Sequence, residues 1–282
     1  MDMISFTQKV ALITGASSGI GRSTAILFAK LGCRLSLIGR DEQRLKETVM
    51  ECQKVSGTQH PPGKEPYLYV VADFVDLRQI DAAFAKTLSH FSQLDILINN
   101  AGCLPRDSIE TMDMEQLDRT MKVNLYSAMH LTQLAVPSLT KTKGTVVNVS
   151  SVCGSRSFSG ILSYCVSKAA LDQFTKCVAL ELAPKGIRVN SVNPGVIVTP
   201  LQRRGGMSPE EYERFLDNSK TSHALGRPGE PEEVAQAIAF LASSASSFTT
   251  GHLLAVDGGR GVMCPRKENE SECLPMFFLK SV

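Results

Sequence analysis

Seven short apolar runs alternate with amphipathic stretches along this chain, and this alternation limits the possible folds more than any other feature. Runs such as VALIT (10–14), DILIN (95–99) and TVVNV (145–149) are almost continuously apolar, as expected of parallel strands that are covered on both faces. The predicted strands are Val10–Thr14, Arg34–Ile38, Tyr67–Ala72, Ile96–Asn99, Thr145–Val149, Arg188–Val192 and Leu253–Val256. The predicted helices lie near residues 20–31, 41–54, 76–91, 112–138, 164–183 and 231–243. Together they predict an α/β fold with a single doubly wound parallel sheet of about seven strands and helices on both faces.

The composition argues against several other classes of protein. A net charge of +2 without a dense cluster of lysine and arginine gives no basis for binding nucleic acid. No apolar run approaches ~18 residues, so no membrane span is expected, and the N-terminus predicts no secretory signal. The eight cysteines and five histidines lack the spacing of metal ligands. We therefore expect free thiols, no metal and a cytoplasmic protein.

Three segments interrupt the alternation. Residues 56–66 form a polar loop rich in proline and glycine. Residues 200–230 are irregular, with one short helix predicted after Ser208, where a proline and a capping-box glutamate follow. Residues 261–282 follow the last strand, and their MFFL stretch (276–279) either docks on a neighbouring subunit or belongs to a frayed terminus. The prediction is one domain, 1–260, and a C-terminal tail, 261–282.

The first predicted strand runs into a glycine-rich turn, TGASSGIGR (14–22), at the start of the next helix. Its glycines let the backbone approach a ligand closely, and the helix N-terminus offers free N–H groups and a positive dipole end to a pyrophosphate. The spacing G-x-x-x-G-x-G differs from the commoner G-x-G-x-x-G, and a merely tight turn is the alternative. With a strand before it and a helix after it, the turn predicts a Rossmann-type nucleotide site at Gly15, Ser17, Ser18, Gly19, Ile20 and Gly21.

The end of the second predicted strand bears on the choice of cofactor. An acidic residue here suits the ribose 2′-hydroxyl of NAD, whereas an arginine suits the 2′-phosphate of NADP. Position 39 is glycine and Arg40 supplies a permanent cation, while Asp41 reads as the N-cap of the next helix. NADP is therefore favoured over NAD, although Arg40 could also be a solvated surface residue.

Polar residues follow the third and fourth predicted strands. Asp73 could accept a hydrogen bond from an adenine amino group, and Asp76 reads as an N-cap. After the fourth strand, the NNAG motif (99–102) places two amides before Ala101 and Gly102. These amides could bridge neighbouring strands and leave room for a flat ribose, or they could simply stabilise a turn.

A serine, a tyrosine and a lysine are the candidates for chemistry. Ser151 follows the fifth strand, Tyr164 starts the next helical stretch, and Lys168 lies one turn later on the same face. A protonated lysine ~5 Å from a phenol stabilises the phenolate by ~3 kcal/mol, roughly two pKa units. We therefore expect Lys168 to bring the pKa of Tyr164 towards neutrality, where a general acid/base works best. Taken alone, the pair would more readily be a core tyrosine and a lysine that reaches solvent.

TGASSGIG, NNAG, Ser151, YCVSK (164–168) and NPG (193–195), in this order and spacing, resemble the short-chain dehydrogenase/reductase family, closest to its carbonyl-reductase and 3-oxoacyl-carrier-protein-reductase-like branch. The resemblance runs from about Lys9 to Gly259. It implies cofactor contacts at Gly15, Ser17, Ile20, Arg40, Asp73, Phe74, Asn100, Pro194, Gly195, Ile197 and Thr199. It also implies a homotetramer that pairs the helices near 112–138 and 164–183 and apposes the last strands.

The resemblance also implies catalytic roles. Tyr164 would exchange a proton with the carbonyl or alcohol oxygen, and Ser151 would polarise that oxygen. Lys168 would lower the tyrosine pKa and bind the nicotinamide ribose, while Asn124 would position a water in the proton relay.

Clues to the substrate are few. A mostly apolar pocket is expected, as is usual for small molecules, and residues 200–226 are expected to form a lid over it. Arg203 and Arg204 within the lid either attract an acidic substrate or are solvated, and Cys153 is expected in the pocket wall rather than as a nucleophile. The expected pocket residues are Leu104, Pro105, Cys153, Arg156, Phe158, Ile161, Val196 and Leu201, beside Ser151 and Tyr164.

The leading hypothesis is an NADPH-dependent reductase of ketones or aldehydes in which Tyr164 gives the proton. The alternatives are an NAD-dependent alcohol or steroid dehydrogenase working oxidatively, and a non-catalytic nucleotide-binding regulator or scaffold. The scaffold is disfavoured because both Tyr164 and Lys168 are present.

Overall fold

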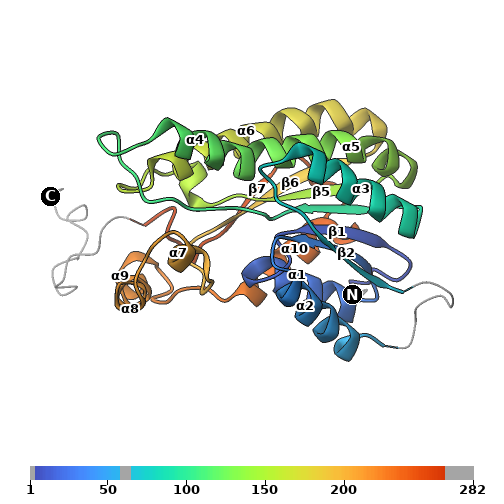
Figure 1. The fold of residues 1–282 in the computed structure, drawn as a ribbon, viewed down its shortest axis with the longest axis horizontal. Coiled ribbons are helices and arrows are strands. Elements are labelled where there is room, and N and C mark those ends of the chain that lie inside the picture. The colour runs from blue at the N-terminus through green and yellow to red at the C-terminus, as the bar shows by residue number, and fades with distance from the viewer. Residues whose placement is uncertain (1–3, 58–64, 264–282) are drawn as a thin grey trace, which may run out of the picture.

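The computed structural model describes residues 4–57 and 65–263. Their seven strands form one parallel sheet in the order β3-β2-β1-β4-β5-β6-β7, with β1 to β3 wound in one direction and β4 to β7 in the other (Figure 1). The winding therefore reverses between β1 and β4, the place where doubly wound sheets bind their ligands. The strands are β1 Val10–Thr14, β2 Arg34–Gly39, β3 Tyr67–Val71, β4 Ile96–Asn99, β5 Thr145–Val149, β6 Arg188–Pro194 and β7 Leu253–Val256.

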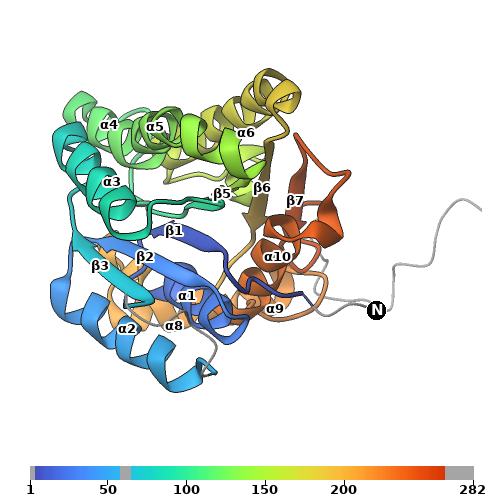
Figure 2. The ribbon, with the colours of Figure 1, turned by 90° about the vertical axis from the view of Figure 1, so that its right-hand side faces the viewer.

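Helices cover both faces of this sheet, so the predicted fold class is confirmed (Figures 1 and 2). One layer holds α1 Gly19–Lys30, α2 Glu42–Val55 and α10 Pro231–Ala242. The other holds α3 Leu77–Phe91, α4 Met114–Met121, α5 Ser127–Thr142 and α6 Leu162–Leu182. Each layer closes its own apolar core against the sheet, which is why β1 and β4 are apolar on both faces. Three 3₁₀ turns complete the layers: η2 Val152–Gly154, η3 Ala183–Lys185 and η4 Ser244–Ser246.

Several boundaries differ from the sequence predictions. The long helix predicted for 112–138 is three elements, because a π-helical segment, η1 Lys122–Tyr126, separates α4 from α5. Strand β2 extends by one residue to Gly39 and β6 by two to Pro194, since pairing with the neighbouring strand continues there, whereas β3 stops at Val71. The predicted N-caps are confirmed: Asp41 accepts from the N–H of Arg44, and Asp76 accepts from the N–H of Arg78.

The segment after β6 contains three short helices rather than the single one expected: α7 Leu201–Arg204, α8 Pro209–Asp217 and α9 Ser219–Ser222. They lie at one end of the sheet (Figure 1). The predicted capping box at the start of α8 is present, with Ser208 and Glu211 as its two members. The ion pair between Arg106 and Glu211 ties α8 to the loop after β4, with a nitrogen–oxygen distance of 3.1 Å. Most of the loop 56–66 and the tail from 264, including 276–279, lie outside the described residues.

Within these described ranges, no helix has the length and apolar character needed to cross a membrane. The same ranges contain no group of three or more histidine, cysteine or acidic side chains that could hold a metal ion.

Candidate active site

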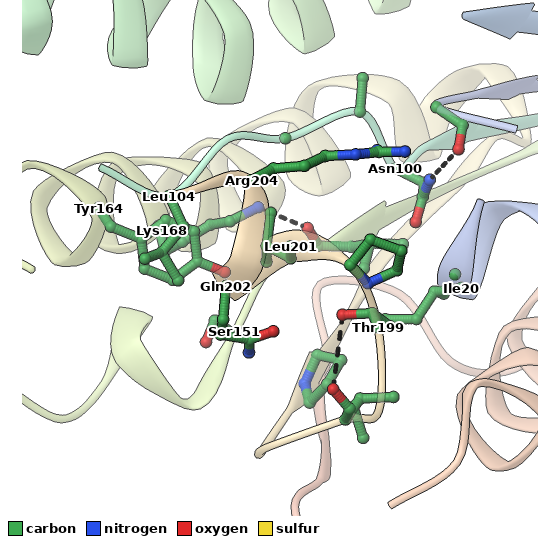
Figure 3. Close-up of a pocket in the computed structure, with 18 of the residues that line it drawn as sticks. Ile20, Asn100, Leu104, Ser151, Tyr164, Lys168, Thr199, Leu201, Gln202 and Arg204 are labelled. Atoms are coloured by element: carbon green, nitrogen blue, oxygen red, sulfur yellow. Dashed lines mark hydrogen bonds between the residues drawn. The ribbon is translucent and has the colours of Figure 1, made fainter. Parts of the chain in front are cut away.

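A cleft of about 1030 Å³ runs along the carboxyl ends of the strands, over the place where the winding reverses. Figure 3 shows the part of it that contains Tyr164, Lys168 and the residues after β6. Nearly all of the predicted site residues line this cleft. They are Gly15, Ser17, Ser18, Gly19, Ile20, Arg40, Asp73, Phe74, Asn100, Ala101, Gly102, Leu104, Ser151, Cys153, Ile161, Tyr164, Lys168, Pro194, Gly195, Ile197 and Thr199.

The glycine-rich turn is held open by bonds to the end of β4. Gly15 and Gly19 have φ values of 66° and 53°, a conformation that side chains other than glycine rarely adopt. The Asn100 amide donates to the carbonyls of Thr14 (2.8 Å) and Gly15 (3.2 Å). It therefore links the ends of β1 and β4, which agrees with the strand-bridging role that was one of the two predicted for the NNAG amides. The turn therefore presents its backbone to the cleft.

Two residues predicted to bind the cofactor or to act in catalysis, Gly21 and Asn124, do not line the cleft. A Cβ at position 21 would collide with the Asn100 amide and the Gly15 carbonyl, so Gly21 permits α1 to pack closely beneath the turn. Asn124 lies in η1 and is buried, with its side-chain oxygen accepting from the N–H of Cys103 and its nitrogen donating to the Cys103 carbonyl and to Ser167. These bonds fix the loop after β4 against α6.

Three guanidinium groups meet at the β2 end of the cleft. Arg40 and Arg44 come from the end of β2 and the start of α2, and both line the cleft. Arg204 reaches the same region from α7, where it donates to the Ser18 hydroxyl at 3.0 Å, and Figure 3 shows it extending away from Tyr164. Burial, followed by the charges of Arg44 and Arg40, lowers the pKa of Arg204. No local pattern indicated that Arg204 would face the glycine-rich turn rather than the substrate.

Ser151, Tyr164 and Lys168 converge at the opposite part of the cleft, and all three are buried. The Lys168 ammonium lies 5.6 Å from the centroid of the Tyr164 ring. Its Nζ donates to the Val149 carbonyl at 2.8 Å, so the end of β5 holds the lysine beside the phenol (Figure 3). The Ser151 hydroxyl accepts from the N–H of Cys153, and its effect on the neighbouring Tyr164 phenol is to lower the pKa of that group.

The expected lowering of the tyrosine pKa is not found. Burial raises the pKa of Tyr164 well above its usual range, and Ser151 opposes this only in part. Burial also lowers the pKa of Lys168 to about 8. The distance between the two groups alone predicts a lower pKa for the tyrosine, but removing each charge from water has a cost, and this cost acts on both groups. At neutral pH the lysine is charged and the phenol carries its proton.

A buried cluster that no sequence pattern signalled joins the loop of Ser151 to α6. The Asn193 amide donates to the Ser151 carbonyl at 3.0 Å and to both carboxylate oxygens of Asp172, which lies one turn after Lys168. Gly154 packs so closely on this carboxylate that any side chain there would collide with it.

Asp107 is a second residue that the sequence did not reveal. It lies in the loop after β4, yet its buried carboxylate accepts from the N–H of Ser163 (3.0 Å) and from the Ser163 hydroxyl at the start of α6. It thereby caps the helix that carries Tyr164. Capping patterns are local, and this cap is 56 residues from Ser163 along the chain.

The part of the cleft beyond Ser151 is largely apolar, as predicted. Leu104, Cys153, Phe158, Ile161, Val196 and Leu201 line it. Pro105 and Arg156 do not: Arg156 turns towards the chain end and donates to the carbonyls of Arg260, Gly261 and Met263. The lining also includes Met207, Phe215 and Arg260, which were not predicted.

The cysteines in the described ranges are free thiols, as expected. Burial raises the pKa of Cys153 to about 11, so this thiol is not ionised at neutral pH and forms part of the pocket wall.

Comparisons with known proteins agree with this geometry. The family model described as enoyl-(acyl carrier protein) reductase matches residues 15–260. The 3-oxoacyl-[acyl-carrier-protein] reductase FabG of Thermotoga maritima is 39% identical over 89% of this chain and 97% of its own length. The L-xylulose reductase of Mus musculus is 36% identical over 88% of this chain and 95% of its own.

A solved structure shows the same fold. The short-chain dehydrogenase/reductase of unknown function from Caenorhabditis elegans, crystallised with cofactor, has a TM-score of 0.85 at 36% identity and covers 92% of this chain and 97% of its own. The chain therefore belongs to the short-chain dehydrogenase/reductase family and is an NAD(P)-dependent oxidoreductase.

Proposed function

We propose that this protein is an NADPH-dependent reductase of a ketone or aldehyde, with Tyr164 as the proton donor. The observation that carries the proposal is the division of one cleft into two parts. The Ser151, Tyr164 and Lys168 side chains lie in one part, and the guanidinium groups of Arg40, Arg44 and Arg204 lie in the other.

The residues of the cleft fit a nicotinamide dinucleotide. The turn at Gly15 to Gly21 offers backbone and a helix N-terminus for a pyrophosphate, and Gly39 leaves space beside the Ser17 hydroxyl at the end of β2. Asp73, Phe74 and Asn100 border the same space. The bound nicotinamide supplies the hydride for reduction.

The preference for NADPH is supported by the charge of the adenosine end. Among the described residues, the only ion pair of these three arginines joins Arg44 to Asp41, whose carboxylate also caps α2. Arg40 and Arg204 form none, so a 2′-phosphate beside Gly39 would meet two uncompensated cations. NAD has no 2′-phosphate, so its binding would leave the charges of Arg40 and Arg204 without an anionic partner.

The proton chemistry follows from the protonation states. Tyr164 enters the reaction as a neutral phenol and can donate its proton to a carbonyl oxygen that the Ser151 hydroxyl holds in place. The ammonium of Lys168, 5.6 Å from the ring, stabilises the resulting phenolate by about 3 kcal/mol at an effective dielectric of ~20. Asn124 supports this site by fixing the loop after β4, and both donors of its side-chain amide are engaged by Cys103 and Ser167.

A carbonyl panel with both cofactors tests the proposal. We expect turnover of ketones or aldehydes with NADPH, and its loss in Tyr164→Phe with cofactor affinity unchanged. If Tyr164→Phe kept its turnover, Tyr164 would not be the proton donor. Binding of NADPH by the wild type without turnover of any carbonyl would favour a non-catalytic role.

The cofactor assignment is tested by the dissociation constants of NADPH and NADH in wild type and Arg40→Ala. We expect the variant to lose affinity for NADPH by about tenfold or more and to bind NADH as before. Arg203→Ala, an exposed neighbour of Arg204, is the matched control. If wild type prefers NADH and oxidises alcohols, the NAD-dependent dehydrogenase is the correct alternative.

We also propose a homotetramer in the cytoplasm. Apolar side chains are exposed on the outer layer formed by α4, α5 and α6, among them Met114, Met129, Val166 and Leu180. Such a surface suits a partner helix layer. Light scattering of the purified protein would decide the assembly.

A further inference from the structure

Arg260 is a cation of the cleft to which the reaction described above gives no role. It follows β7 and the Asp257-Gly258-Gly259 turn, and its side chain lines the cleft. The guanidinium carbon lies 4.7 Å from the centroid of the Phe158 ring. Its positive charge lowers the pKa of the Cys153 thiol, which is two residues from Ser151 along the chain. The charged group therefore belongs to the substrate end of the cleft.

The guanidinium of Arg260 has no anionic partner among the described residues. Its Nε is buried without a hydrogen-bond partner there, and the group takes part in no ion pair of the described ranges. The nearby Asp257 carboxylate is engaged by the backbone N–H groups of Gly259 and Gly261. The guanidinium carbon lies over the face of the Phe158 ring, and no group of the described residues accepts a hydrogen bond from the guanidinium N–H donors.

The segment that carries Arg260 is held in place by a second arginine. Arg156 donates from one nitrogen to the carbonyls of Arg260 (2.9 Å), Gly261 (3.1 Å) and Met263 (3.1 Å). The Arg156 guanidinium thus binds backbone carbonyls, and its positive charge repels that of Arg260. Burial and this repulsion lower the pKa of Arg260, yet a guanidinium keeps its charge at any physiological pH.

A partly buried cation with unused donors in a largely apolar part of the cleft is costly unless an anion joins it. We propose that the substrate carries a carboxylate, which binds the edge of the Arg260 guanidinium while its carbonyl group lies between Ser151 and Tyr164. The substrate class is therefore an oxo acid with an apolar body. This inference rests on the proposed reductase function, because it deepens the description of the same site.

Binding without turnover gives the first test. We would titrate the protein loaded with NADP⁺ with cyclohexanecarboxylate and with the uncharged cyclohexanecarboxamide, and follow the heat. Since a hydrogen-bonded charge contributes about 1.5–3 kcal/mol, the acid should bind about ten- to a hundredfold more tightly than the amide. Arg260→Gln should bind both equally. Arg203→Gln, at an exposed position of α7, should behave as wild type.

Arg260→Lys keeps the charge and the flexible stem, so it should retain a preference for the acid even if the glutamine variant folds poorly. Equal binding of acid and amide by wild type would refute the proposal. The proposal would also be refuted if Arg260→Gln still bound the acid more tightly than the amide. It would be refuted as well if a folded Arg260→Lys variant bound the two equally.

Turnover gives the second test and separates the two proposals. Wild type should reduce 4-oxocyclohexanecarboxylate with a higher kcat/KM than its methyl ester, mainly through KM, and Arg260→Gln should remove this difference. Reduction of acid and ester at equal kcat/KM would overturn the inference and leave the reductase assignment standing. Tight binding of the acid without reduction of any carbonyl would overturn the reductase assignment and leave the carboxylate site standing.

Discussion

Lys168 should make the stability of this protein depend on pH in a way that a single substitution can isolate. Burial lowers its pKa to about 8 from the ordinary 10.5. Between these values the unfolded chain binds more protons than the folded one, so stability rises with pH in this window. At 1.36 kcal/mol per pKa unit, keeping the buried ammonium charged costs about 3 kcal/mol at pH 7. About 2 kcal/mol of this cost remains at pH 9.

Lys168→Met removes that cost but adds another. The Val149 carbonyl loses its donor, and an unpaired buried carbonyl costs about 1–3 kcal/mol at every pH. The absolute change in stability is therefore small, whereas its pH dependence is diagnostic. Relative to the variant, wild type should gain about 1.3 kcal/mol of unfolding free energy between pH 7 and pH 9. The variant should also lose its activity.

Urea unfolding followed by circular dichroism at pH 7, 8 and 9 measures this difference directly. Lys176→Met is the control, because Lys176 is exposed about two turns farther along α6 and should give a difference that is flat with pH. A flat difference for Lys168→Met as well would refute the view that a buried charge stands beside Tyr164.

Three further predictions follow from the same structure. Reduction should slow above about pH 8 as Lys168 loses its proton, and a rate that is constant to pH 10 would contradict the role given to its charge. Asp107→Ala should lower the unfolding free energy by about 1–3 kcal/mol and reduce kcat through loss of the α6 cap, whereas Asp113→Ala at the exposed start of α4 should cost about 1 kcal/mol and leave kcat unchanged. Gly21→Ala should weaken ADP binding in calorimetry because its Cβ collides with the Asn100 amide; Gly57→Ala, where a Cβ meets nothing, is the control, and equal affinities would contradict the packing argument.

The sequence predicted the strands well because parallel strands covered on both faces are apolar without interruption. Its errors lie where tertiary contacts decide. The residues of η1 continue a helical pattern, so the widening of the helix around Asn124 leaves no local sign. The ends of β2 and β6 depend on pairing with the neighbouring strand rather than on the identity of Gly39 or Pro194.

In the candidate site, too, residues in local sequence patterns were easier to predict than residues positioned by tertiary contacts. Most residues of the motifs line the cleft, since a motif is a local pattern on one strand end or one helix. The positions of Arg204 and Arg260 were not predicted, because each is set by a contact with a distant segment, at Ser18 and at Phe158. The pKa of Tyr164 was predicted in the wrong direction because burial cannot be read from the four-residue spacing to Lys168.

The buried Asn193–Asp172 cluster has a consequence for how such an enzyme can diversify. It joins the strand end bearing Ser151 to the helix bearing Tyr164, and none of its members belongs to the segment from α7 to α9. The pair proposed to transfer the proton is thus preorganised by the scaffold, independently of the elements that cover the pocket. Replacements in those covering elements can change which molecules enter while the geometry of proton transfer is inherited intact.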